Sequence, residues 1–518
     1  MSSPKSSISA KKIKNICFLV TTTFAALESN AQTSSNQNSS LGGLFLLSSN
    51  VSITETWTDN ISLANGVRES GWISTVSPGL ALRSTSGRIK GNLNYSLNFV
   101  NYSNGGNKNS SQNSLNSNAN IELIDGHGYI DLSGVISQQT ISAFSVQSNS
   151  LNAISNPNRT EVSTYSISPY YKGNLSSFLS YQARHRLTTT SAKNANAFST
   201  DDSATTLNLN SDNFLGKLSW GLDLNQQSTS RVNNPDVEIF SLNTSLRYPL
   251  FDKFSLSVSA GRQNQNYSSV NKVSSWTSGA GLNWSISDVT KISASMENNP
   301  LGKMHSLNFE HRTPRTSWRV SDVKSVSLNN TKNSSSSTSN FDLLFNQFAS
   351  IEPDINKRIQ LVNNYMLLNG ISSSASTLNG YLTSGTSVQR AQNISFALLG
   401  IRDTITLTAT RSNGKRIATT SSSFDDFSNS GSILQEGISV AYTHRLTENT
   451  VVSNQISKQK TQGDTALLGS EVKSINLTAS TRIGQKTNFS ISARHSVSSG
   501  SSFPYKETAV TGSLAVQF

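Results

Sequence analysis

Three features of the sequence predict an all-β fold, a closed transmembrane barrel of antiparallel strands. Apolar residues recur at every second position over segments of about nine to eleven residues, as on a membrane strand with one apolar face. Only 35% of the residues are apolar, yet aromatic residues still make up 8%. Connections are short at one end and long at the other. Together these features predict an outer-membrane β-barrel of about 22 strands, within a range of about 20–24.

The N-terminal residues predict export from the cytoplasm. Lys5, Lys11, Lys12 and Lys14 precede an apolar run over residues 16–27, and small residues follow at 29–31. We therefore assign residues 1–31 to a signal peptide that is removed. The apolar run is about twelve residues long, whereas a transmembrane helix needs about 20. It contains the single cysteine of the chain, so disulfides have no part in the mature fold.

Residues 32–49 form a polar lead rich in Ser and Asn, and the barrel is predicted over residues 50–518. A first strand fits Val51–Thr58, and Arg88–Asn98 alternates most clearly, with apolar residues at the odd positions. The same alternation recurs near residues 175–184, 217–225, 240–248, 279–286, 404–410 and 475–483. The aromatic residues expected on the lipid side, near the interfacial girdles, are Tyr95, Trp220, Tyr248 and Trp284.

The connections distinguish a barrel from a soluble β-sandwich, which also alternates. Short turns such as 447–449 and 484–486 alternate with long polar segments. The long segments are predicted over residues 101–118, 188–205, 263–275, 413–432 and 458–473. Outer-membrane barrels place short turns in the periplasm and long loops outside, so both ends of the barrel are expected on the periplasmic side.

One long insertion interrupts the pattern at residues 329–392. Within it, Ile355, Ile359, Val362 and Met366 have helical spacing, and Pro353 stands where a helix would start. The sequence predicts an amphipathic helix near residues 354–368. It either packs on its own loop or folds into the lumen as a constriction.

The last stretch, Thr508–Phe518, predicts how the barrel closes. Val510, Leu514, Val516 and Phe518 share one parity, and small or polar residues share the other. A strand left unpaired at a sheet edge invites aggregation, and pairing the last strand with the first removes that edge. We predict that Phe518 is the residue that the barrel assembly machinery reads.

Several segments resemble one known family. Residues Thr54–Leu63, Val76–Leu82, Ser86–Leu97 and Arg312–Trp318 are similar to motifs of the PEP-CTERM/exosortase system-associated outer-membrane protein family, as is the stretch from Asp342 to Arg358. The resemblance extends over nearly the whole mature chain. It implies a Gram-negative outer-membrane barrel in a system that makes exopolysaccharide and sorts PEP-CTERM proteins. It implies no catalytic residues, because the family has no agreed biochemical activity.

Charge on the predicted lumen side suggests what passes through it. The sequence carries 42 basic and 30 acidic residues, and removing residues 1–31 leaves 38 and 29. Strand parity places three carboxylates inside: Asp223, Glu297 and Glu310. The basic residues predicted to face the lumen are Arg88, Lys90, Arg184, Arg186, Lys217, Arg247, Lys291, Arg312, Arg482 and Arg494. A low-dielectric wall focuses the field of such charges and enriches anions.

These observations predict a passive channel or porin, with exopolysaccharide or another anionic polymer as the exported solute. The alternative is a non-conducting scaffold that anchors exported PEP-CTERM proteins or polysaccharide at the surface, its basic residues balancing one another or binding lipid phosphates. The expected partners are outer-membrane lipids, the barrel assembly machinery, and exopolysaccharide or its export components.

Other classes fit the sequence less well. The scattered positive charge forms no run of the kind that binds nucleic acid. The six histidines match no metal or hydrolase motif, so we expect no enzyme, no metal site and no cofactor. A 22-strand TonB-dependent transporter would carry a large plug domain, whereas about eighteen residues precede the first predicted strand. An adhesin of stacked β-repeats gives no reason for an aromatic closing strand.

Overall fold

The computed structural model describes most of the barrel. The described residues are 40–41, 45–84, 86–103, 109–148, 156–193, 195, 198–232, 234–267, 271–328, 331–332, 345, 358, 362, 378, 380–417, 425–465, 467–500 and 503–518. The predicted signal peptide lies outside the described residues. No helix in these ranges is long and apolar enough to span a membrane.

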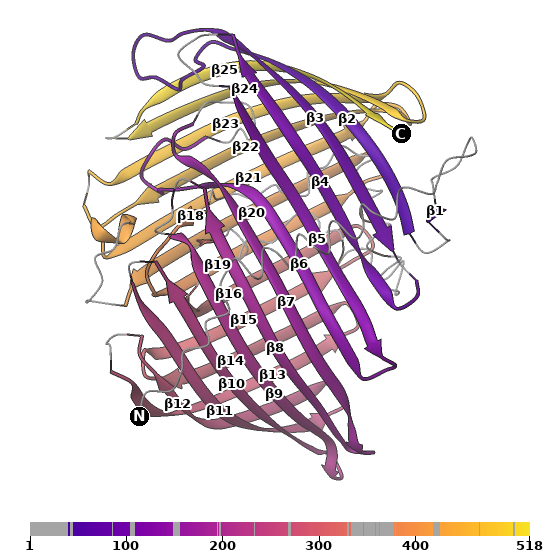
Figure 1. Ribbon diagram of the computed structural model, residues 1–518, viewed down its shortest axis with the longest axis vertical. Coiled ribbons are helices and arrows are strands. Elements are labelled where there is room, and N and C mark those ends of the chain that lie inside the picture. The colour runs from indigo at the N-terminus through magenta and orange to yellow at the C-terminus, as the bar shows by residue number, and fades with distance from the viewer. Residues whose placement is uncertain are drawn as a thin grey trace.

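Twenty-two antiparallel strands pair in sequence order and close into a barrel (Figure 1). Its first half consists of β2 Phe45–Thr58, β3 Gly71–Ser84, β4 Ile89–Tyr102, β5 Ser110–Ile124, β6 Gly128–Thr140, β7 Arg159–Ser176, β8 Leu179–Ala192, β9 Thr200–Leu215, β10 Leu218–Arg231, β11 Asn234–Phe251 and β12 Phe254–Gln265. The second half consists of β13 Val273–Ser287, β14 Thr290–Asn299, β15 Gly302–Arg312, β16 Thr316–Ser327, β19 Ser387–Leu399, β20 Asp403–Arg416, β21 Ser432–Arg445, β22 Thr450–Gln462, β23 Gly469–Arg482, β24 Thr487–Gly500 and β25 Tyr505–Gln517. The all-β barrel of about 22 strands is therefore confirmed.

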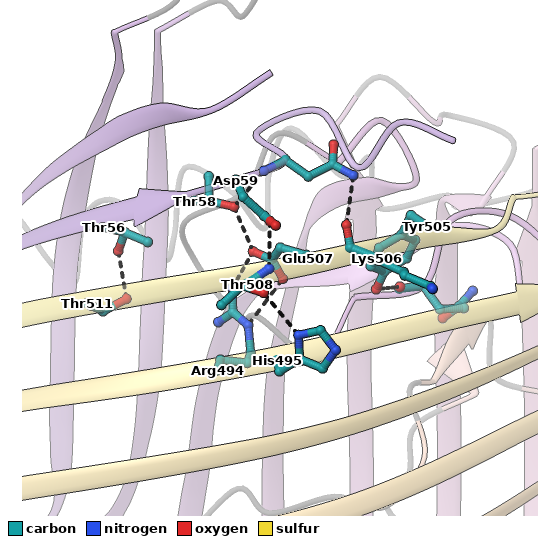
Figure 2. A network of polar contacts seen from close by, with 12 residues as sticks. Thr56, Thr58, Asp59, Arg494, His495, Tyr505, Lys506, Glu507, Thr508 and Thr511 are labelled. Atoms are coloured by element: carbon teal, nitrogen blue, oxygen red, sulfur yellow. Dashed lines mark hydrogen bonds and ion pairs between the residues drawn. The ribbon is translucent and has the colours of Figure 1, made fainter. Parts of the chain in front are cut away.

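The barrel closes between β2 and β25, which lie side by side in Figure 1. Their register runs from Asn50 opposite Gln517 to Thr58 opposite Ala509. On the lumen side, hydroxyl pairs Thr54–Ser513 and Thr56–Thr511 each lie 2.9 Å apart; Figure 2 shows the second pair. The predicted pairing of the last strand with the first is confirmed.

Alternation separates a lipid face from a lumen face on every strand. On β2 and β3, Ile53, Val76 and Leu80 are 41–48% exposed and point outward. The neighbouring Thr56 and Thr58 point inward and are buried. Of the predicted girdle residues, Tyr248 and Trp284 are exposed on the outer face, and Tyr95 and Trp220 have the same outward parity. An apolar exterior with a polar interior is the arrangement that a bilayer requires.

The strands are longer than the sequence predicts. β2 starts at Phe45 instead of Val51, because residues 46–49 pair with residues 80–83 of β3. The predicted long segments shrink to residues 103–109, 193–199, 266–272, 417–431 and 463–468. In each case mostly polar residues continue the ladder past the lipid belt, where no apolar alternation marks them as strand.

Connection lengths confirm the two different ends of the barrel, with three exceptions. One end carries turns of two to four residues, and we assign it to the periplasm. The other end carries the longer loops, but residues 232–233 and 300–301 are two-residue links at that same end, and residues 501–504 are a four-residue link. The strict alternation of short and long connections that the sequence suggests is therefore wrong at these three hairpins, where adjacent strands extend almost until they meet.

The insertion between β16 and β19 spans residues 328–386, slightly different bounds from those expected. Its two ends pair as the short strands β17 Thr331–Lys332 and β18 Tyr381–Leu382. The predicted helix near 354–368 lies outside the described residues, apart from Arg358 and Val362. Both of these are helical, and Val362 is fully buried.

Deleting Phe518 should reduce the amount of folded barrel in the outer membrane while leaving export intact. Its backbone N–H donates to the carbonyl of Ser49 at 2.8 Å, so the deletion removes a contact of the closing seam. The heat-modifiable fraction of outer-membrane protein on gels measures assembly, with Gln517→Ala as the control. Normal assembly of the truncated chain would contradict the role given to Phe518.

Single-cysteine labelling should confirm the orientation, because the mature chain is predicted to have no cysteine of its own. Thr465→Cys, in the 463–468 loop, should react with a membrane-impermeant maleimide on whole cells. Glu448→Cys, in a turn at the other end, should react only after the outer membrane is permeabilised. The reverse result would place the long loops in the periplasm.

Candidate functional site

The lumen has two different walls. On β19–β21 most lumen-facing side chains are small and buried. Ser395 and Ala397 are fully buried, and Thr404, Thr406 and Thr408 are each at most 5% exposed. Burial of this degree inside a wide barrel requires protein to cover the wall. On β10–β14 the corresponding residues are partly exposed. The lumen is therefore open along β10–β14 and covered along β19–β21.

A recess of about 270 Å³ lies on this open wall. Most of its lining is polar and comes from lumen-facing positions of β9–β14, although Trp220, Val258, Ala280 and Met296, which have outward parity, also line it. The lining side chains that matter below are Asn210, Asn243, Ser245, Arg247, Ser257 and Glu297. Hydroxyl and amide groups surround one guanidinium and two carboxylates, Asp212 and Glu297, so the recess offers both donors and acceptors to a polar solute.

Lumen-facing charge is concentrated at the periplasmic mouth. Nine basic residues in the described strands face inward within four residues of that end, and we call them the periplasmic ring: Arg83, Lys90, Lys172, Arg247, Lys291, Arg312, Arg319, Arg445 and Arg482. Four acidic residues meet the same criterion: Glu122, Asp131, Asp212 and Glu310. Two of them form ion pairs, Glu310 with Arg319 at 3.4 Å and Asp131 with Arg184 at 2.6 Å. The mouth keeps a net positive charge.

Five of the ten basic residues expected from the sequence belong to this ring: Lys90, Arg247, Lys291, Arg312 and Arg482. Two others are not on strands. Arg88 lies in the turn before β4 and pairs with Asp125 at 2.6 Å, and Lys217 lies in the turn between β9 and β10. Alternation along the strands predicted that Arg88 and Lys217 face the lumen. Both lie in turns at the rim of the barrel, where the inward–outward alternation of a strand does not apply.

Arg184, Arg186 and Arg494 lie higher in the lumen. Arg184 is held by Asp131, by the Ser168 hydroxyl at 3.1 Å and by the Tyr170 ring, whose centroid lies 4.1 Å from its guanidinium carbon. Arg186 is exposed two residues further along β8. Arg494 and Glu507 form a two-point ion pair, which Thr58 joins by donating to Glu507 (Figure 2). Two of these three arginines are therefore held in ion pairs.

The sequence analysis missed four residues of the ring: Arg83, Lys172, Arg319 and Arg445. Each shares the parity of lumen-facing neighbours, as Arg83 does with Ala81 and Ser77. The inward–outward alternation that marks them is therefore present in the sequence. They lie near strand ends, beyond the segments in which apolar alternation is clear. The three acidic residues expected inside, Asp223, Glu297 and Glu310, do face the lumen.

Loops bridge the extracellular mouth. Ser142 and Ala143, after β6, donate to the carboxylate of Asp426 through the Ser142 hydroxyl and the Ala143 backbone N–H, both at 2.6 Å. Asp426 begins the short 3₁₀ helix Asp426–Ser428 after β20. Twelve barrel strands separate the two loops on one side and ten on the other. The contact therefore crosses the mouth, and we call residues 141–148, 381–386 and 425–430 the mouth bridge.

The mouth bridge is also packed by apolar side chains. Phe144, Tyr381, Phe427 and Ile433 are buried in one cluster, which Leu468 partly covers. Asp425 accepts from the Ser384 backbone N–H at 2.6 Å, so the end of the insertion is tied to the same helix. The Tyr505 hydroxyl donates to the carbonyl of Gln147 at 2.6 Å and attaches the bridge to β25.

Asp426 is the carboxyl group of the bridge whose pKa is clearly shifted. Burial raises its pKa to about 6, and the nearby Asp425 carboxylate acts in the same direction. The hydrogen bonds from Ser142 and Ala143 lower the pKa but do not outweigh burial. In the 463–468 loop the opposite holds: hydrogen bonds, first from the Ser432 hydroxyl, keep the pKa of Asp464 below its ordinary value.

Comparisons with known proteins add only distant structural similarity. No protein-family model matches the sequence, and the search of curated proteins found no match. Among the structures found, the FrpB iron transporter from Neisseria meningitidis (F5-1 variant) has a TM-score of 0.48 and 12% identity, covering 91% of this chain and 82% of that one.

Two further structures come from Pseudomonas aeruginosa. A mutant of the ferric enterobactin receptor PfeA has a TM-score of 0.46 and 9% identity, covering 91% of this chain and 80% of that one. OprD has a TM-score of 0.31 and 9% identity, covering 91% and 95%. These values are too low to support an argument about transport. Among the described residues, no group of three or more His, Cys, Asp or Glu side chains could hold a metal ion.

Replacing Asp426 by Asn should remove a pH dependence of the mouth bridge. A carboxyl whose pKa is raised in the docked state stabilises docking at low pH, and this stabilisation is lost as pH rises toward 6. Docking should weaken about tenfold between pH 5 and pH 8. Hydrogen exchange of amides 142–148, compared between the native chain and Asp426→Asn at each pH, measures this. An unchanged ratio would show that Asp426 does not titrate in the bridge.

Proposed function

We propose that this barrel is a passive outer-membrane channel for anionic, hydroxyl-rich solutes that enter from the periplasm. The observation that carries the proposal is the periplasmic ring, with nine inward basic residues against four acidic ones. Cations grouped at one mouth of a low-dielectric pore raise the local concentration of anions there. The direction of enrichment favours export over uptake.

The path beyond the ring runs along β10–β14. The recess there is lined by Ser and Asn side chains beside Arg247 and Glu297, and such groups hydrogen-bond to sugar hydroxyls. A channel must bind weakly enough to release its solute. Short Ser and Asn side chains on a wide wall provide many weak contacts and no deep pocket.

The resemblance to the PEP-CTERM/exosortase-associated family suggests the solute. Systems of that kind make exopolysaccharide, and an acidic polysaccharide combines the two properties that the ring and the recess favour. We therefore propose exopolysaccharide or another anionic polymer as the exported solute, with its export components as partners. A deletion strain that secretes normal amounts of extracellular polymer would argue against this assignment.

A scaffold that does not conduct is the second candidate, and one observation favours it. The β19–β21 wall is covered and the mouth bridge spans the extracellular opening, so the lumen is obstructed at two places. In this case the loops would present a surface for exported proteins or polymer. Conductance separates the two candidates.

Planar-bilayer recordings of the pure protein should show an anion-selective conductance. Neutralising Lys90, Arg247 and Lys291 to Gln should lower the anion preference about fivefold, since unit charges 10 Å apart interact by about 0.4 kcal/mol in water and salt screens part of this. The reversal potential in a KCl gradient measures the change.

A matched control neutralises three outward residues, Arg262, Lys303 and Lys324, to Gln. This triple variant changes the net charge equally but should leave selectivity unchanged. A closed barrel would favour the scaffold, and equal loss of selectivity in both triple variants would show that the lumen charges have no special part.

A further inference from the structure

The outer face of the barrel carries positive charge at one end of β20–β25. Six basic residues have outward parity there, and we call them the outer cationic patch: Arg411, Lys415, Lys458, Lys460, Lys473 and Lys506. The same strands carry exposed apolar residues nearer the periplasm, including Ile438, Ile456, Ile475 and Val510. The patch therefore begins where the lipid belt ends.

The outer cationic patch lies at the height expected for the lipid headgroups of the outer leaflet. Each patch residue lies eight to twelve residues from the periplasmic end of its strand. At about 3.4 Å per residue and a tilt of about 40°, that distance is about 20–30 Å along the membrane normal. The apolar band of such barrels is about 25 Å tall. The basic side chains thus reach the layer just outside it.

The patch is not neutralised within the described part of the chain. Lys458 and Lys473 lie directly opposite each other on β22 and β23 and share one carboxylate, Glu471, at 3.1 and 2.9 Å. Arg411 pairs with Glu436 at 3.2 Å. Six basic residues thus face two carboxylates. Like charges directly opposite on adjacent strands are destabilising, so this arrangement favours an added anion.

Outward basic residues at this height lie on β12, β15, β16 and β19 as well as on β20–β25. Besides the patch they are Arg262, Lys303, Lys324 and Arg390, and Arg390 pairs with Asp322. Outward positions at the same end of β2, β9 and β11 carry carboxylates instead: Glu55, Asp201 and Glu238. Glu55 lies on β2, which pairs with β25, so the sign of the charge changes directly beside the patch. Strands β20–β25 carry six of these ten outward basic residues against two carboxylates, which favours an anionic partner at the patch.

We infer that the outer cationic patch binds the phosphate groups of a phosphorylated glycolipid in the outer leaflet. The acyl chains would lie on the exposed apolar residues below the patch, and the phosphates would contact Lys458, Lys473 and Lys506. The residues on β22, β23 and β25 are close because Lys458, Lys473, Val497 and Lys506 occupy one register row. This inference is independent of the proposed channel, because these residues face away from the lumen.

Binding of lipid A to the purified full-length mature barrel tests the inference. Native mass spectrometry with lipid A carrying two phosphates should detect bound lipid, and the same lipid without phosphates should bind far more weakly. The triple variant K458Q/K473Q/K506Q should lose about a hundredfold in affinity, since each lysine near a lipid phosphate contributes a factor of about five. Its heat-modifiability should match the native barrel.

The control variant K90Q/K172Q/K291Q changes charge equally but inside the lumen. It should bind lipid A like the native chain, whereas the patch variant should keep its conductance. Equal binding of the phosphate-free lipid, full displacement by millimolar inorganic phosphate, or unchanged affinity of the patch variant would each overturn the inference. A change in the ion selectivity of the control variant would test the proposed channel and would not affect the inference about lipid binding.

Discussion

Backbone hydrogen bonding in the membrane is the constraint on which the structure depends. No water reaches the hydrocarbon layer, so every strand needs a partner on both sides, and only a closed ring provides this. The pairing of β2 with β25 closes that ring. Once it is closed, each strand has one lipid face and one lumen face, and alternation along the sequence decides which residues meet lipid and which meet water.

The barrel also carries its basic residues at different heights on its inner and outer faces. Inside, basic residues gather at the periplasmic mouth, whereas the pairs Arg184–Asp131 and Arg494–Glu507 balance the lumen above it. Outside, basic residues gather on β20–β25 at the opposite end. A single scaffold therefore presents positive charge to two different environments without bringing the two groups close together.

Local features of the sequence predict the barrel but not its mouth. The parity of residues such as Ile53, Lys90 and Val510 follows from period-two alternation alone, and so does the closing strand. Strand ends were harder to predict, because Ser and Asn continue the ladder without an apolar face. The contact between Ser142 and Asp426 joins residues 284 positions apart, and nothing in either segment marks the other as its partner.

The mouth bridge changes what the loops can tolerate during evolution. Surface loops of barrels ordinarily vary freely in length, since lengthening a flexible loop costs little. Residues 141–148 and 425–430 are instead anchored to each other across the opening, so a length change in either one shifts a buried contact in the other. Diversity imposed by phage or antibodies is then expected to accumulate in 193–199 and 266–272, while the bridging loops change only together.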